Sequence, residues 1–383
     1  MISDKLSSSK PRKFFRGAAI FISLLLSLVC IRTKSYSGDP LSFIIPNFIL
    51  YLPIDVNLKR RAWRYFVRYD DLPIVKEQEV PIIYPQADGQ LDFNALRIAT
   101  KNFRNPAVVR GLFLNTTATE KWPQKGYLAG KIGHFRIAVI QKGQHNAKGG
   151  QKDRQVELFG DAINHILENE NSRKYLFFPV HSRTHYDGYN GTETMELIKE
   201  TNILTHDDLY LESKLWRNYG NKDVHKRFFG GQMIAGRGYS DDKSDLIRSK
   251  NTTGTDWHCA AGNNWFVQVA GRKRWYFLDQ KYSSWMRPIR SGQGSIATGD
   301  DMLENQKHFP VQFVDLSPGD MLYNPDWMWH RIENYVGLNI ACPLREVNIT
   351  LSLRNNLQFS TVVIVNKLYV KMFGKVGEAM ATD

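Results

Sequence analysis

The sequence predicts a mainly β fold with helical elaboration, of the double-stranded β-helix or jelly-roll type. Aromatic residues make up 12% of the chain, with nine Trp and seventeen Tyr, and such residues favour sheet. Short runs of β-branched and aromatic residues alternate with Gly- and Pro-containing turns in the second half. Helical periodicity is confined to the stretch before them, which indicates a β-barrel or jelly roll with helices added at its N-terminal side.

Composition divides the chain into four segments. Residues 1–54 form an N-terminal signal anchor and apolar segment, 55–100 a connector, 101–353 the globular domain, and 354–383 a C-terminal tail or helix. The net charge is +13, and six of these charges lie in the first 34 residues. The rest shows no Lys/Arg run interleaved with aromatics, so no nucleic-acid partner is predicted.

The N-terminal segment carries an uncharged apolar run at residues 17–31. The run is shorter than the ~20 residues that comfortably span a bilayer, and five basic residues precede it while two follow. This bias predicts a retained single-pass anchor, with the N-terminus cytoplasmic and the domain in the secretory lumen. The alternative is a secreted protein, because Ser35 and Ser37 offer small residues for signal cleavage.

Local patterns predict the elements of the body. We expect helices over Val156–Glu168 and Asp208–Tyr219, a short strand Tyr175–Pro179 ended by its proline, and a Gly-punctuated strand and loop over Arg227–Gly238.

The clearest β pattern follows. Trp265–Leu278 is expected to be a hairpin that turns at Ala270-Gly271-Arg272, and Val311–Tyr323 a strand, a Pro318-Gly-Asp320 turn and a second strand. Ile340–Leu353 supplies further strands, and Thr361–Phe373 a closing helix or strand.

A candidate metal site lies in the stretch Thr255 to Asn264, with His258 at its centre and a second histidine, His330, 72 residues later. Along a regular strand His258, Ala260, Gly262, Asn264 and Phe266 would share one face. Lys273, Trp275 and Phe277 would share another, and a lysine among aromatic residues needs an anionic partner because an unpaired buried charge is costly. A dicarboxylate would supply that partner.

Three blocks of the sequence resemble the JmjC/cupin-like superfamily of Fe(II)- and 2-oxoglutarate-dependent oxygenases, over roughly residues 100–348. They are Asn105–Gly111, Thr255–Phe277 and Pro318–His330. Carried over by position, the resemblance implies that His258 and His330 bind iron. It implies that Thr255, Asn264 and Lys273 hold 2-oxoglutarate, with Lys273 on the distal carboxylate.

The sequence departs from the family pattern at Ala260, where the third metal ligand, an Asp or Glu, belongs. The same His-x-Ala variant occurs in 2-oxoglutarate-dependent halogenases, in which chloride or bromide fills the vacant position. We therefore predict a membrane-anchored enzyme that uses Fe(II), 2-oxoglutarate and O2 to oxidise an aliphatic C–H bond, by halogenation. Its substrate would be a small molecule or lipid, although the family also acts on protein side chains.

Other interpretations of Ala260 stay open. Asp256 or water could complete the metal shell of a hydroxylase, or the barrel could be a non-catalytic cupin-like binding protein. The two histidines could also be ordinary core residues. The cysteines leave a similar choice, because Cys259 and Cys342 form either one bridge or two buried free thiols.

Overall fold

The computed structural model describes residues 72–141, 154–182, 200, 204–211, 214–215, 228–238, 254–282, 285–286, 289–291, 295–297, 305–346, 348–356 and 360. By internal contacts the chain divides into two units, residues 1–68 with 281–289, and residues 69–280 with 290–383. The second unit carries the fold. The predicted anchor and the Thr361–Phe373 element lie outside the described residues, and no helix within those residues is long and apolar enough to span a bilayer.

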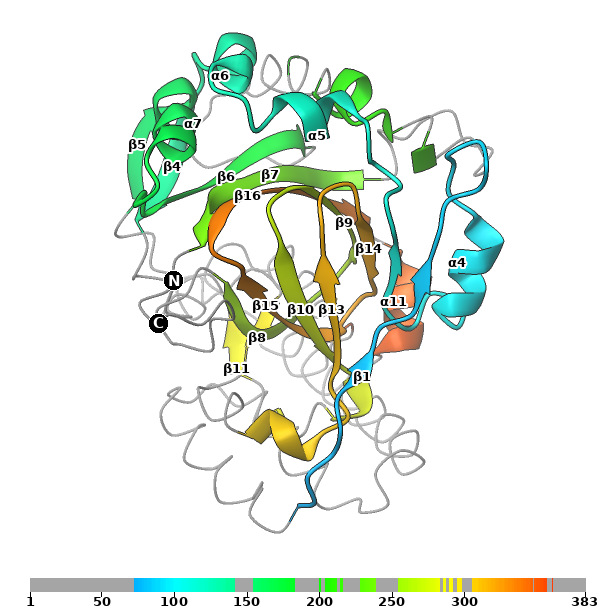
Figure 1. Cartoon of the computed structure of the whole chain (residues 1–383). Helices are drawn as coiled ribbons and strands as arrows, with labels where there is room; N and C mark the ends of the chain where they lie inside the picture. Colours follow the sequence, from blue (N-terminus) through cyan, green and yellow to red (C-terminus); the bar gives the residue numbers. More distant parts are fainter. Residues whose placement is uncertain are drawn as a thin grey trace, which may run out of the picture. The chain divides into compact units, whose positions relative to one another are not determined.

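Two β-sheets dominate the second unit (Figure 1). The seven-stranded sheet has the order β1 (Gln78–Glu79), β13 (Gln312–Leu316), β10 (Lys273–Leu278), β15 (Trp329–Asn334), β8 (Thr255–Ala260), β12 (Ser295–Ala297) and β11 (Ile289–Ser291). The nine-stranded sheet has the order β2 (Ile82–Ile83), β3 (Ala107–Val109), β14 (Met321–Asn324), β9 (Asn263–Ala270), β16 (Gly337–Glu346), β7 (Phe228–Gly238), β6 (Lys174–Ser182), β4 (Arg136–Gln141) and β5 (Arg154–Leu158).

The chain changes sheet at successive turns. It passes from β8 to β9 to β10, and again from β13 to β14 to β15 to β16, crossing between the sheets each time. This alternation confirms the predicted double-stranded β-helix. The predicted hairpin Trp265–Leu278 is wrong, because β9 pairs with β14 and β16, while β10 pairs with β13 and β15. The strand, turn and strand predicted over Val311–Tyr323 are confirmed as β13 and β14, which lie in different sheets.

Sequence pattern alone does not separate a hairpin from a sheet-to-sheet crossing, since both join two strands through a short turn. The difference lies in burial. Every residue of β9 is buried, because one face packs on the opposite sheet and the other lies under helices. Gly271 makes the crossing to β10 at φ +71°, and a Cβ there would meet the Leu338 carbonyl oxygen at 1.9 Å.

The described residues form two hydrophobic cores. The first lies between the nine-stranded sheet and the helices that cover its outer face, α4 (Phe93–Ala99), α5 (Thr117–Lys121), α6 (Tyr127–Ile132) and α7 (Phe159–Glu168). The second lies between the two sheets, and Phe266, Trp275 and Phe277 belong to it. The face on which each side chain lies therefore decides whether it supports the helices or lines the interior of the barrel.

The helices confirm the predicted elaboration only in part. The helix expected from Val156 begins at Phe159, because the first three residues complete β5. Ile349–Asn355 forms helix α11 where a strand was expected, with the Asn348 side chain accepting a hydrogen bond from the Leu351 N–H at its start. An asparagine at a helix N-terminus satisfies an otherwise unpaired backbone donor, and the β-branched residues after it do not outweigh that signal.

Two expected element ends are also wrong. Strand β6 continues through Pro179 to Ser182, and its register with β7 shifts between Pro179 and His181. The irregularity accommodates a residue that lacks the N–H of a regular ladder. β7 runs unbroken through Phe228–Gly238, so its glycines do not end it.

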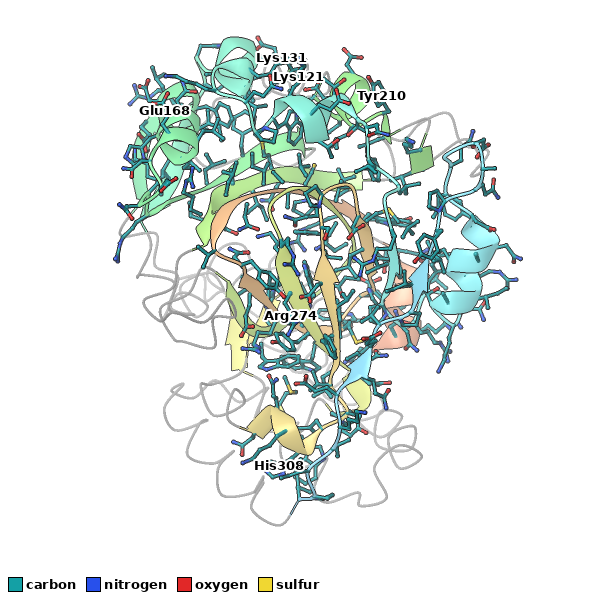
Figure 2. All side chains as sticks on the ribbon, viewed as in Figure 1. Lys121, Lys131, Glu168, Tyr210, Arg274 and His308 are labelled. Carbon is teal, nitrogen blue, oxygen red and sulfur yellow. The ribbon has the colours of Figure 1, made fainter. Side chains whose placement is uncertain are left out.

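Of the helix expected over Asp208–Tyr219, the described residues 211, 214 and 215 are helical, and the Lys214 N–H donates to the Tyr210 carbonyl oxygen at 3.0 Å. A π-helical segment at Leu204–Asp208 precedes them. Asp208 is nearly fully buried and accepts hydrogen bonds from three donors, Trp122 Nε1 (2.8 Å), the Tyr127 hydroxyl (3.0 Å) and Lys131 Nζ (2.8 Å). Lys131 lies on α6 (Figure 2). A buried carboxylate with this many donors is well satisfied, so Asp208 fastens the segment to α5 and α6.

Candidate functional site

The two histidines meet on the inner face of the seven-stranded sheet. His330 on β15 stands directly opposite His258 on β8, and their ring centroids are 4.1 Å apart at an interplanar angle of 56°. On the other side of β15, Phe277 stands opposite His330, and Trp275 stacks on the His330 ring at 5.4 Å. Trp275 and Phe277 belong to the core between the sheets, so both imidazoles lie inside the barrel.

Thr255 reaches the same face through a bulge. His258 pairs with His330 and Thr255 with Ile332, so β8 uses three residue steps where β15 uses two. One extra residue on β8 reverses the alternation, and residues directly opposite one another in an antiparallel pair lie on the same side of the sheet. Strict alternation would have placed Thr255 and His258 on opposite faces.

Ala260 lies beside His258 on this inner face. In the pairing of β8 with β12, Ala260 stands opposite Ser295 and His258 opposite Ala297, without irregularity. The methyl group of Ala260 therefore lies next to the imidazole, at the position for which the sequence resemblance implied a metal carboxylate. Among the described residues, no group of three or more His, Cys, Asp or Glu side chains could hold a metal ion. The Asp256 side chain lies outside the described residues.

The expected single strand from His258 to Phe266 is wrong. β8 ends at Ala260, Gly262 turns the chain at φ +99°, and β9 begins at Asn263 in the other sheet. Asn264 and Phe266 nevertheless lie opposite Asn324 and Leu322 of β14, and Phe266 and Leu322 belong to the core between the sheets. The opposite sheet thus presents Asn264 to the same interior.

Asn264 and Asn324 place amide groups close to the histidines. Asn324 Nδ2 lies 3.4 Å from His330 Nδ1, so the amide group of β14 stands close to the imidazole of β15. The Oδ1 atoms of both asparagines and the hydroxyl of Thr255 are buried without a hydrogen-bond partner in the described part of the chain. Unpaired buried polar atoms are costly, so this set indicates a place for a polar ligand.

Lys273 is the charged residue of this interior. It is 3% exposed, its Nζ donates to Asn334 Oδ1 at 2.5 Å, and burial lowers its pKa to about 7. Within the described ranges no ion pair joins it to an acidic side chain. Its neighbour Arg274 (Figure 2) takes the other face and forms two hydrogen bonds with Asp315, at 2.7 and 2.6 Å. Among the described residues, Arg274 therefore has a carboxylate partner and Lys273 has none.

His330 is held as a neutral imidazole. Its Nδ1 lies 2.8 Å from the Met328 carbonyl oxygen, and because a carbonyl only accepts, this nitrogen carries the proton and leaves Nε2 with its lone pair. Burial, helped by the positive charges of His258 and Arg345 and opposed by the Met328 hydrogen bond, lowers the pKa of His330 well below the ordinary value. A neutral imidazole oriented by a backbone carbonyl is typical of metal-binding histidines.

These residues fit a metal and a small dicarboxylate. Two imidazoles would hold the metal, and the buried Lys273 amine and three unpartnered oxygens lie on the interior faces of the two sheets. The structure thus brings together all six residues that the sequence singled out, and their roles stay predictions. Sequence reasoning missed Asn324, Asn334 and Arg345 as neighbours of the site, because nothing in one sequence separates them from ordinary strand residues.

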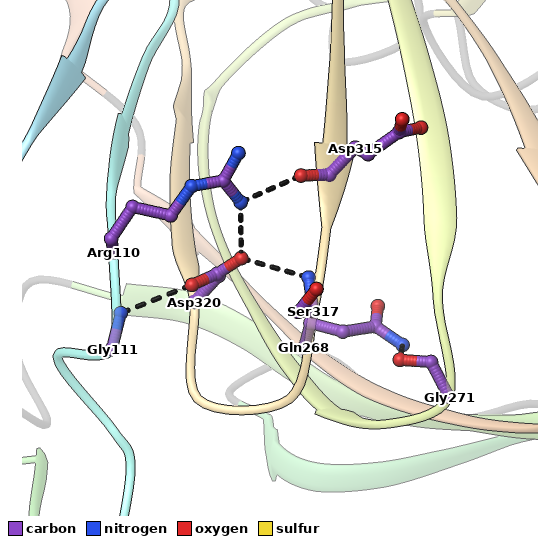
Figure 3. Close-up of polar contacts among 7 residues, drawn as sticks. All are labelled: Arg110, Gly111, Gln268, Gly271, Asp315, Ser317 and Asp320. Atoms are coloured by element: carbon purple, nitrogen blue, oxygen red, sulfur yellow. Dashed lines mark hydrogen bonds and ion pairs between the residues drawn. The ribbon is translucent and has the colours of Figure 1, made fainter.

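Parts of two sequence blocks that carry the resemblance, Asn105–Gly111 and Pro318–His330, stabilise the fold. The Asp320 carboxylate of the Pro318-Gly-Asp turn accepts hydrogen bonds from the Gly111 N–H (3.0 Å), the Ser317 N–H (2.8 Å) and Arg110 Nη1 (2.5 Å) (Figure 3). The same Arg110 nitrogen donates to the Asp315 carbonyl oxygen at 2.6 Å. These contacts tie β3 to the crossing from β13 to β14, so Arg110 and Asp320 support the barrel that carries the site.

The two cysteines of the domain are free thiols. Cys259 and Cys342 are both buried and unbridged, and burial raises the pKa of Cys342. Of the two arrangements that the sequence left open, the structure has the unbridged one. Cys342 is therefore a poor nucleophile and metal ligand, because both uses require the thiolate.

Comparison with known proteins gives the family. The family model described as "Cupin-like domain" matches residues 99–344, which is more than half of the chain and includes both histidines, Ala260 and the three polar residues. A search of curated proteins found no match. A cupin-like domain with this fold fits a JmjC-type oxygenase or a cupin-type binding protein. The chain belongs to the cupin-like domain family.

Proposed function

We propose that the protein is an Fe(II)- and 2-oxoglutarate-dependent enzyme that oxidises an aliphatic C–H bond. The observation that carries this proposal is the buried Lys273 ammonium, without a carboxylate partner in the described residues, on the same inner surface as the two facing imidazoles. Such an ammonium is costly unless an anion joins it. A small dicarboxylate beside a metal satisfies it, as well as the unpartnered oxygens of Thr255 and Asn264.

Each residue has a definite part in this proposal. His258 and His330 would hold the metal, Lys273 the distal carboxylate of 2-oxoglutarate, and Thr255 and Asn264 its other polar atoms. When bound, iron and 2-oxoglutarate supply an O2-dependent oxidation in which the co-substrate becomes succinate and CO2.

The protein's contribution is orientation and the exclusion of water. The Met328 carbonyl fixes the tautomer of His330, and the Trp275 ring stacks on it. Phe266 packs edge-on against Trp275 at 4.8 Å. These aromatic walls keep the polar groups in a dry environment, where each charge interacts more strongly than it does in water.

Ala260 decides the kind of oxidation. A carboxylate in its place would supply both a ligand atom and a negative charge, and a methyl group supplies neither. Chloride or bromide would restore both, so we propose halogenation, in which the substrate C–H, halide, O2, 2-oxoglutarate and a proton give the C–halogen bond, succinate, CO2 and water. The regular pairing that holds Ala260 beside His258 supports this. Hydroxylation is the second candidate, with water or another ligand in the coordination position that Ala260 leaves vacant.

The test uses the full chain with Fe(II) and 2-oxoglutarate. Under anaerobic conditions the visible absorption of the metal–co-substrate complex should shift when chloride or bromide is added, and in air the release of succinate should rise with halide. Ala260→Asp should abolish the spectral shift and lower halide-dependent succinate release at least tenfold. Ala261→Asp, the same change outside strand β8, is the matched control.

Three other results would contradict parts of the proposal. Halide-independent succinate release would support the hydroxylase. A halide response that persists in Ala260→Asp would refute the proposal that halide binds in the position left vacant by Ala260. If the wild-type chain bound neither metal nor 2-oxoglutarate, the protein would be a cupin-type binding protein for another ligand.

A further inference from the structure

A loop between β14 and β15 contacts the end of strand β8, where Ala260 lies. The Trp327 N–H donates a hydrogen bond to the Ala260 carbonyl oxygen at 3.0 Å. The Asp326 carboxylate accepts one from the Gly262 N–H, and the Asp326 N–H donates to Asn263 Oδ1 at 3.1 Å. Two adjacent loop residues thus bond to three of the four residues from 260 to 263, which carry the chain from β8 into β9.

Strand pairing holds Ala260 on one side. β12 pairs with β8 and places Ser295 opposite Ala260, but β12 is three residues long. On the other side, the described pairing of β8 with β15 ends at His258, opposite His330. The Trp327 N–H therefore supplies the main-chain contact that holds Ala260 on the β15 side. The loop thus replaces, at the end of β8, the support that a neighbouring strand gives elsewhere.

The Asp326 side chain is fully buried against this turn. Gly262 is also buried and has φ +99°, which is outside the strand region, so its N–H does not continue the ladder of β8. A buried N–H without a partner is costly, and Asp326 Oδ1 is the partner that the structure provides. The Gln280 side chain also holds the loop, because its Nε2 donates to the Asp326 carbonyl oxygen at 2.7 Å.

Trp327 is held in an unusual backbone conformation. It has φ +61°, which is uncommon for a bulky residue and strains the chain. Such conformations persist where the surroundings enforce them, and they cluster at functional sites. The Trp327 ring is fully buried, and its Nε1 lies 2.9 Å from Ser352 Oγ of α11 and 2.8 Å from Ser360 Oγ. Helix α11 thus fixes the side chain, and the strained backbone presents its N–H to Ala260.

We propose that Asp326 and Trp327 are positioning residues, which hold residue 260 beside His258 and thereby set the coordination position that the halide would occupy. This inference rests on the proposed function for the metal and the halide. In it neither residue touches the metal or the halide, and both act through the backbone of the turn. Positioning matters because a displacement of ~1 Å can lower a rate about 100-fold.

The test compares halide binding with co-substrate binding. The full chain with Fe(II) and 2-oxoglutarate is titrated with chloride or bromide in the absence of O2, and visible absorption reports the occupied complex. Asp326→Ala removes the acceptor for the Gly262 N–H and should raise the halide dissociation constant at least about tenfold. Its affinity for N-oxalylglycine, a non-reacting dicarboxylate, should stay within about threefold of the wild type on the Mn(II)-loaded chain, because Lys273 bonds to Asn334 and not to this loop.

Two further variants examine the chemistry of the contacts. Asp326→Asn keeps an oxygen acceptor in the same place, so its halide dissociation constant should stay within about threefold of the wild type. Trp327→Phe keeps an aromatic ring and removes the indole donor that bonds to Ser352 and Ser360. It should raise the halide dissociation constant at least about threefold, and it tests the same loop if Asp326→Ala fails to fold.

Asp208→Ala is the matched control for stability. Asp208 is also a buried carboxylate that accepts hydrogen bonds, but its donors are Trp122, Tyr127 and Lys131 on the helical side of the nine-stranded sheet. This variant should lower the Tm in a thermal unfolding scan, as Asp326→Ala does, and leave the halide dissociation constant unchanged.

Three results would overturn the inference. They are an unchanged halide dissociation constant in Asp326→Ala and Trp327→Phe, an equal rise in Asp208→Ala, and a loss of N-oxalylglycine affinity as large as the loss of halide affinity. If the wild type binds no halide, the proposed halogenation fails separately, and amide hydrogen exchange of the metal-free chain decides on the loop. Residues 258–264 should then exchange faster in Asp326→Ala than in the wild type or Asp208→Ala. Equal exchange in this segment would mean that Asp326 does not hold residue 260.

Discussion

Lys273 shows most clearly how one side chain can lower stability in order to serve a ligand. It is buried, has one neutral hydrogen-bond partner, Asn334, and its pKa is lowered to about 7. Because the unfolded chain holds that proton up to a much higher pH, the free energy of unfolding should rise with pH above 7, where the folded protein releases the proton first. The residue is thus poorly suited to an empty barrel and well suited to a bound anion.

The pKa of Lys273 predicts how co-substrate binding depends on pH. Below pH 7 the ammonium is charged in the free protein, so the affinity for N-oxalylglycine should be highest there. Above pH 7 binding must take up a proton, so the dissociation constant should rise about tenfold per pH unit. Calorimetry on the Mn(II)-loaded protein between pH 6.5 and 9, in buffers of different ionisation enthalpy, measures both the affinity and the proton uptake.

Lys273→Arg is the control, because a guanidinium stays charged throughout this range and its profile should be flat. A flat profile for the wild type, with no proton uptake, would contradict the assignment of Lys273 to the dicarboxylate.

Thr255 illustrates the limit of sequence reasoning for a single residue. Its spacing of three from His258 would put it on the opposite face of a regular strand. The resemblance nevertheless assigned it to the site. The bulge in β8 adds one residue between Thr255 and His258, which puts both side chains on the same face. A bulge depends on the hydrogen bonds of the neighbouring strand, so alternation within β8 could not reveal it.

At the scale of the element, the turns between sheets distinguish this fold from a stack of hairpins. The turn at Gly271 combines a positive φ with close contact to the Leu338 carbonyl. The prediction of a turn there was right, whereas the prediction of which strands it joins was wrong. The residues of the turn specify that the chain changes direction. Which strands pair depends on segments that are distant in the sequence.

Gly271→Ala should therefore be costly. The added Cβ would clash with backbone, which cannot move aside as a side-chain end can, and the positive φ adds strain. We expect a loss of at least about 2 kcal/mol in the free energy of unfolding, measured by denaturant titration. Gly130→Ala, inside α6 where a Cβ meets nothing within 4 Å, should instead stabilise by up to about 1 kcal/mol. Equal effects of the two changes would refute the role given to the Gly271 crossing.

At the scale of the whole molecule, the site joins the two sheets. His258, His330, Thr255 and Lys273 come from the seven-stranded sheet and Asn264 from the nine-stranded sheet. A ligand held by both sheets binds the folded state and not the unfolded chain, so its binding free energy adds to the stability of the barrel.

This linkage predicts the response to heat. Mn(II) with N-oxalylglycine at one hundred times its dissociation constant should stabilise the wild type by about 2.7 kcal/mol, which raises the Tm in a thermal unfolding scan. Lys273→Met should abolish this rise, yet its ligand-free form should unfold at a higher temperature than the wild type, because a buried charge has been removed. Lys76→Met, an exposed change, should leave both quantities unaltered. A ligand-free Lys273→Met less stable than the wild type would contradict the cost assigned to the ammonium.

The sequence by itself determined the class of fold and singled out six candidate site residues, because aromatic and β-branched runs, turn glycines and three ordered blocks are local features. Only the tertiary structure decided that β9 and β10 part into different sheets, that Thr255 turns inward, that Asp320 and Arg110 support the scaffold, and that Asp326 and Trp327 lie against the end of β8. These depend on pairing between strands distant in the chain. The face that a strand residue occupies follows from its neighbours across the sheet, and no single segment of sequence contains them.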